Sequence, residues 1–123
     1  MPRGPLVAIG SNRRYRLTGA AAFASVFRDG RRFDAQHVQL LVTAAAGPVG
    51  RVGFVIGKQH LPRAVDRNYV RRTLREAVRR RLREMKRFDI VLRVRGRCER
   101  ASLSALGQEA AELLDAFLLH KPR

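Results

Sequence analysis

Residues 51–79, RVGFVIGKQHLPRAVDRNYVRRTLREAVR, decide the fold, because within them the spacing of apolar residues changes from two to about 3.6. Apolar side chains alternate with others over 51–58, which predicts a β-strand. From 63 to 83 they gather on one side at helical spacing, which predicts an amphipathic α-helix. A second alternating run at 89–95 completes a strand–helix–strand crossover that presents the helix at the molecular surface.

The predicted helix has an apolar stripe that consists of Val70, Leu74, Ala77, Val78, Leu82 and Met85. Arg81 falls inside this stripe, so either the helix frays there or the Arg81 stem extends outward to solvent. Asp66 is expected to support the helix N-terminus, and Glu76 to pair with arginines three or four residues away. Within the preceding strand, Gly53 and Gly57 indicate either a bulge or the close approach of a ligand.

The arc that adjoins the apolar stripe of this helix is basic. Arg67, Arg71 and Arg75 follow one another at a spacing of four, and Arg72 and Arg79 widen the arc. Asn68 lies among them and can both donate and accept hydrogen bonds, which suits RNA hydroxyls or base edges. Because only one acidic residue lies between 67 and 83, the pattern favours nucleic-acid contact over a merely solvated charged face.

N-terminal to this unit, the sequence predicts a short helix followed by a strand hairpin. Phe23, Val26 and Phe27 form one apolar stripe, with Thr18 as the expected N-cap and Gly30 at the C-terminal end. Residues 37–44 alternate as a strand, Gly47 and Pro48 indicate a turn, and 31–36 can add a short extra strand.

The C-terminal segment predicts a packing helix. Its stripe consists of Leu103, Leu106, Ala110, Leu113, Leu114 and Phe117. Ser102 or Ser104 is the expected cap, and the acidic Glu109, Glu112 and Asp115 make its surface unsuitable for phosphate. The element order predicts an α+β fold with one sheet, in a domain over 13–119 between a leader at 1–12 and a tail at 120–123.

Composition points to an acidic partner. Twenty-six Lys and Arg against ten Asp and Glu leave a net charge of +16, and most of the cations are Arg, which grips phosphate in a bidentate manner. A single cysteine, Cys98, argues against a disulfide framework and a thiolate zinc site. His37, His60 and His120 lack ligand spacing, and no apolar run is long enough to span a membrane. A reduced, cytoplasmic protein is expected, with no catalytic and no metal-binding residues of its own.

The stretch 51–79 resembles the signature of the bacterial ribonuclease P protein family. YRLTGAAAFASVFRDGRR at 15–32 is similar to that family's N-terminal Phe-x-x-Val-Phe helix, and KRFDIVLRVRG at 86–96 to its Asp-Ile/Val-Val strand. About 90 residues, from 15 to 117, follow the family in order and spacing. The resemblance implies an α-β-β-β-α-β-α two-layer sandwich, like ribosomal protein S5, with a mixed four-stranded sheet and a left-handed β-α-β crossover.

The resemblance also implies a division of labour, in which an RNA subunit cleaves with magnesium ions and the protein binds that RNA and the 5′ leader of precursor tRNA. The residues that match the helix meeting the catalytic RNA are Arg67, Asn68, Arg71, Arg72 and Arg75, and Arg79 extends the set. Those that match the leader cleft are Phe23, Phe27, Val52, Phe54 and Lys58, although either phenylalanine can instead be core. The protein itself is expected to hold no cofactor and to need no membrane and no obligate protein partner.

Two positions depart from the family, since Tyr69 and Gln59 stand where basic residues are usual. Both departures weaken the local positive potential, and Tyr69 can instead stack on a base or hydrogen-bond to phosphate. Two other functions fit the composition: a ribosome-associated RNA-binding protein, and an amphipathic protein that binds anionic membranes. The identity of copurifying RNA separates the ribonuclease P function from the ribosome-associated one. Liposome binding that survives nuclease treatment favours the membrane-binding function.

Overall fold

The structure is a computed structural model that describes residues 16–96 and 98–120. The predicted leader at 1–12 and all but the first residue of the predicted tail lie outside the described residues. The elements are α2 (Ala20–Asp29), β1 (Arg31–Asp34), β2 (Val38–Ala44), β3 (Val52–Val55), α3 (Ala64–Arg79), α4 (Leu82–Met85), β4 (Phe88–Val94), the 3₁₀ helix η2 (Arg100–Ala105) and α5 (Leu106–His120). The short extra strand and the crossover are present as predicted. The predicted hairpin of 37–44 with 51–58 is wrong, because β4 lies between β2 and β3 and pairs with both.

The four strands form one mixed sheet in the order β1-β2-β4-β3. The β1–β2 and β2–β4 pairs are antiparallel, whereas β3 and β4 are parallel neighbours joined through α3. Phe33, Leu40, Leu92 and Phe54 lie side by side across the sheet, so one face carries a continuous apolar row. This α+β architecture with a mixed four-stranded sheet confirms the predicted fold class.

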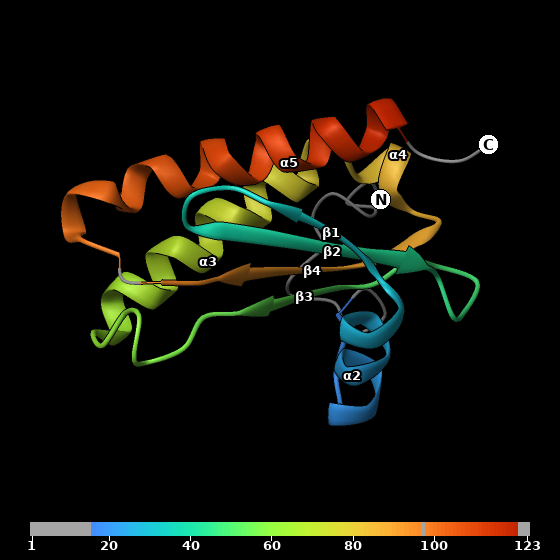
Figure 1. The fold of residues 1–123 in the computed structure, drawn as a ribbon, viewed down its shortest axis with the longest axis horizontal. Helices are drawn as coiled ribbons and strands as arrows, with labels where there is room; N and C mark the ends of the chain where they lie inside the picture. The colour runs from blue at the N-terminus through green and yellow to red at the C-terminus, as the bar shows by residue number, and fades with distance from the viewer. Residues whose placement is uncertain (1–15, 97, 121–123) are drawn as a thin grey trace, which may run out of the picture.

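Helices cover the two faces of the sheet unequally (Figure 1). α3 and α5 form a layer on one face, and their apolar stripes join the sheet in the main core. α2 packs on the opposite face over a small cluster formed by Leu17, Val26, Leu41 and Val91. The α5 stripe is buried, so the prediction of a packing helix is confirmed.

The long helix expected over 63–83 ends early. α3 stops at Arg79, and α4 is a separate turn, because at Arg81 the backbone leaves helical geometry (φ −117°, ψ 14°). The Arg81 side chain turns toward α5, where its Nε donates to Asp115 Oδ1 at 2.7 Å. Its Nη1 donates to the carbonyl of Ala77 in α3 at 2.9 Å. A continuous helix would point this guanidinium into the core, and the break avoids that cost.

The expected helix caps are partly wrong. Gly19, not Thr18, is the N-cap of α2, with φ at +90°, and no side chain caps that helix. Ser102 and Ser104 lie inside η2, because a 3₁₀ turn precedes α5 and occupies the place where the cap was expected. Gly30 does end α2, and its N–H donates to the Val26 carbonyl.

Candidate nucleic-acid interface

α3 holds its basic side at the surface because its apolar side is fully anchored. Val70, Leu74 and Val78 are each 0% exposed in the main core. The predicted RNA-contacting residues other than Arg67 lie on the adjoining arc of the helix, at least partly exposed. The stripe and the arc therefore confirm the amphipathic pattern, while the RNA contact itself stays a prediction.

Of the six residues predicted to contact the catalytic RNA, two arginines are already bound to other elements or to an acidic side chain of the protein. Arg67 Nη1 donates to the carbonyls of Leu61 and Pro62, at 2.9 Å each, and so fastens the loop before the helix. Arg79 is paired with Glu76, which Arg80 also contacts. Hydrogen bonds from Arg79 and Arg80 lower the pKa of Glu76 to about 2, as the predicted i+3 and i+4 pairing implies.

The remaining four positions form the available basic surface. Arg71 Nη1 donates to Asn68 Oδ1 at 3.1 Å, which orients both side chains. No ion pair involves Arg71, Arg72 or Arg75 within the described residues. The Arg75 Nε is buried without a hydrogen-bond partner in that part of the chain. Burial and the neighbouring Arg71 and Arg72 lower the pKa of Arg75, so a bound anion would relieve an unfavourable arrangement.

A hollow of about 170 Å³ at the β3 edge brings the two predicted RNA surfaces together. Phe23 comes from α2, Val52 and Phe54 from β3, and Arg71 and Arg75 from α3. Arg16, Leu17 and Gly53 complete the lining. The predictions placed these aromatics and arginines in separate sites, whereas the structure places them in one hollow where aromatic and cationic groups meet.

Gly53 explains how Phe23 reaches this hollow. A Cβ at Gly53 would lie only 2.6 Å from Phe23 Cζ, so the missing side chain makes room for the aromatic ring. The group in close approach at Gly53 is thus a side chain of the protein itself, not the ligand that was one of the predicted alternatives. Phe23 is thus both a packing residue of α2 and part of the hollow's wall.

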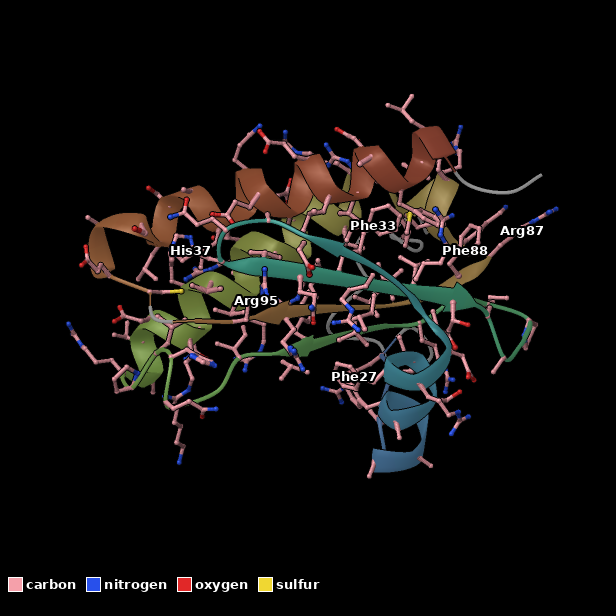
Figure 2. All side chains as sticks on the ribbon, in the orientation of Figure 1. Phe27, Phe33, His37, Arg87, Phe88 and Arg95 are labelled. Carbon is pink, nitrogen blue, oxygen red and sulfur yellow. The ribbon has the colours of Figure 1, made fainter. Side chains whose placement is uncertain are left out.

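Phe27 and Lys58 do not line the hollow. Phe27 is half-buried beside the α2 face of the sheet, and the Arg93 guanidinium lies 5.3 Å from its ring centroid (Figure 2). Lys58 is exposed beyond the end of β3. Arg16 and Arg93 are additional cations that the sequence reasoning missed. For Arg93 the signal was its alternation with Leu92 and Val94, which turns it away from the main core.

One acidic side chain of α5 is held at the start of β2. Glu109 of α5 accepts hydrogen bonds from the backbone N–H groups of His37 and Val38, at 2.7 and 3.1 Å. It also contacts the His37 ring at 2.9 Å. Within residues 16–96 and 98–120, no three acidic, His or Cys side chains come close enough to hold a metal ion. In the same residues, no helix is long and apolar enough to cross a bilayer.

Comparison with known proteins agrees with this architecture. The family model for ribonuclease P matches residues 12–118. The ribonuclease P protein component of Alcanivorax borkumensis is 40% identical over 79 residues, which cover 64% of this chain and 65% of that protein. The one from Burkholderia pseudomallei is 38% identical over 109 residues, which cover 81% and 79%. The matches to A. borkumensis and Paraburkholderia xenovorans span 65% and 63% of those relatives' lengths.

Solved structures share the fold. The ribonuclease P protein of Thermotoga maritima superposes with a TM-score of 0.66 at 23% identity, covering 89% of this chain and 100% of that one. The Staphylococcus aureus protein gives 0.66 at 19% identity, covering 85% and 93%. Because the family model spans nearly the whole chain and carries the basic helix with it, this chain belongs to the ribonuclease P protein family.

Proposed function

We propose that this chain is the RNA-binding protein subunit of ribonuclease P. In this role it binds the catalytic RNA and the 5′ leader of precursor tRNA, and assists endonucleolytic maturation of the tRNA 5′ end. Family membership supports the assignment to this enzyme. The protein acts in the cytoplasm with the RNA and needs no further protein partner.

One observation carries the proposal: the unpaired arginines of α3 adjoin an aromatic hollow. Arg75 keeps a buried Nε without a partner among the described residues, and Arg71 lines the same hollow. Arginine binds phosphate through paired N–H groups, while aromatic rings stack on unpaired bases. The β3 edge therefore offers phosphate contacts from α3 directly beside rings on which unpaired bases can stack.

The two RNA contacts divide along the molecule in this proposal. Asn68, Arg71, Arg72 and Arg75 bind the catalytic RNA, with Arg79 at the end of the arc. Phe23, Phe27, Phe54 and Lys58 bind the leader, and the buried Val52 supports them from below. The RNA subunit cleaves the phosphodiester with its own magnesium ions, and the protein's cations offset phosphate repulsion as the two RNAs approach.

The decisive experiment reconstitutes the purified protein with a bacterial ribonuclease P RNA and follows 5′ cleavage of precursor tRNA. We expect the protein to raise the rate most at low magnesium concentration, where protein cations substitute for bound metal ions in screening phosphate. The protein freed of RNA should not cleave. Equal rates with and without the protein across the magnesium series would contradict the proposal, as would cleavage by RNA-free protein.

A further inference from the structure

A groove runs along the seam between α3 and α5, on the side of α3 away from the β3 hollow. It consists of two adjoining hollows of about 740 and 390 Å³, and both are lined by Tyr69 and Ser104. The helices meet closely at its floor, where a Cβ at Gly107 would collide with the Thr73 methyl group. None of the RNA contacts assigned above except Arg72 lies in this groove.

The end of the groove at Tyr69 is apolar and open to solvent. Tyr69 is 39% exposed and Val65 58% exposed, and only Leu119 joins them as a large exposed apolar side chain in the described part of the chain. Two such residues are too few to seat the apolar face of a partner helix, which needs a longer row of anchors. They are sufficient for one flat ring.

Charges around Tyr69 suit a phosphodiester. Glu76 and Asp115 in the larger hollow are already paired with arginines. Arg63 and Arg72 line the groove on either side of Tyr69 in sequence, and neither forms an ion pair within residues 16–96 and 98–120. The groove therefore offers two available cations beside an exposed aromatic ring.

Asp66 and Ser104 supply the polar groups for the edge of a nucleotide. Asp66 is 8% exposed, lines the smaller hollow, and within the described residues its carboxylate has no hydrogen-bond partner. It can accept a hydrogen bond from a ribose 2′-hydroxyl or a base amino group, and the Ser104 hydroxyl can donate or accept. An RNA nucleotide has the ring, the phosphates and the hydroxyl that these groups match.

We propose that the Tyr69 end of the α3–α5 groove binds one unpaired nucleotide of the partner RNA. The base stacks on the Tyr69 ring, Arg63 and Arg72 hold the flanking phosphates, and Asp66 with Ser104 contacts the sugar or base edge. This proposal rests on the proposed RNA-binding function and adds a second side to it. α3 is then held by RNA along both of its flanks.

The intrinsic fluorescence of Tyr69 can report on this site. The chain contains two tyrosines and no tryptophan, so in a Tyr15→Phe variant Tyr69 is the only tyrosine. We expect single-stranded oligoadenylate to quench the Tyr69 fluorescence, because a stacked base accepts its excitation, and a blunt RNA duplex of equal length to leave it nearly unchanged. The reciprocal variant Tyr69→Phe, in which Tyr15 reports, controls for absorption by the RNA. Equal quenching by strand and duplex would overturn the proposal.

Affinity for ribonuclease P RNA gives a second, independent test. Tyr69→Ala should weaken binding about 5- to 150-fold, the range expected when one base loses its aromatic partner. Tyr69→Phe should restore most of that loss, since a phenyl ring still stacks. Leu119→Ala, on α5 outside the groove, serves as the matched control for removing an exposed apolar group.

The outcomes separate the two proposals. If the unaltered protein binds the RNA and Tyr69→Ala binds equally well, the groove proposal fails while the proposed function stands. If the unaltered protein does not bind the RNA, the proposed function fails and the groove proposal with it. Loss with Ala and recovery with Phe supports a stacked nucleotide, whereas loss in both variants would indicate a hydroxyl contact and overturn stacking.

Discussion

The two faces of the sheet differ in how firmly they hold their helices. Among the described residues, twenty buried side chains form one cluster on the α3–α5 face, whereas the buried cluster on the α2 face has four. Figure 2 places Phe33 and Phe88 between the sheet and α5, and Phe27 on the α2 side. Both faces carry partly buried aromatic rings, but only the first has the extent of burial needed to specify the fold. The less buried face is thus the one with surface to spare for a ligand.

The largest expected effect comes from the main cluster. Leu74→Ala should lower the free energy of unfolding by roughly 2–5 kcal/mol, because Leu74 is fully buried at the centre of α3 and its truncation leaves a cavity. Denaturant titration followed by circular dichroism measures this loss. Leu119→Ala, which is 81% exposed, should stay within about 0.5 kcal/mol. A small effect of Leu74→Ala would contradict the inference that the α3–α5 face contributes more to stability than the α2 face.

The next effect concerns leader binding on the less buried face. Phe27→Ala should weaken the binding of leader-bearing precursor tRNA by about 1–3 kcal/mol and spare mature tRNA, which lacks a leader. Phe33→Ala is the matched control, since Phe33 packs edge-on against Phe117 at 5.8 Å within the other face. Its loss should destabilise the fold and leave the preference for leader-bearing tRNA intact. Equal losses for both tRNAs would assign Phe27 to packing.

A smaller effect tests whether α2 opens independently. Val26 is the buried residue of α2, and Val26→Ala removes two carbon atoms, which is worth roughly 1.6 kcal/mol. If the α2 face is the weaker one, amide hydrogen exchange should accelerate in α2 and remain slow in α3 and α5. Uniform acceleration across all three helices would show that the two faces unfold as one unit.

The smallest effect concerns the ion pair that joins the end of α3 to α5. Arg81 lowers the pKa of Asp115, so the pair stabilises the protein above the ordinary aspartate pKa and loses this contribution as pH falls through the lowered value. Because Asp115 is mostly exposed, the contribution should be about 0.2–1 kcal/mol. Asp115→Asn should lower the melting temperature at neutral pH and much less near pH 2. Glu112→Gln, whose carboxylate accepts from Gln108 and contacts no arginine in the described residues, should show no such pH dependence.

Local pattern was sufficient to predict most of the elements and the basic arc. The alternation of Ile90, Leu92 and Val94 predicts a buried strand face, and the helical spacing of Val70, Leu74 and Val78 predicts a buried helix face. All six side chains are buried. What failed depended on partners distant in sequence. The break at Arg81 involves Asp115, thirty-four residues away, and neither periodicity nor propensity contains that contact.

The candidate site was predicted residue by residue but not as an arrangement. Arg71 and Phe23 were both identified, yet only the folded sheet edge brings them to one hollow. The contact between Gly53 and the Phe23 ring could not be predicted from the sequence for the same reason, since it depends on where α2 packs over β3. The sequence predicts that Tyr69 can stack on a base or hydrogen-bond to phosphate, but the groove beside it depends on the placement of α5 against α3.

The sheet order also sets the sequence of events during synthesis. β4 is the last strand to leave the ribosome, yet it lies between β2 and β3 and pairs with both. Until residue 94 has emerged, the nascent chain can complete only the β1–β2 hairpin, and the arginine-rich helix is exposed without its core. A strongly cationic, unfolded segment is therefore present beside the anionic ribosome from the time α3 emerges until β4 follows it. Folding, and with it the assembly of the β3 hollow, is delayed until β4 has emerged.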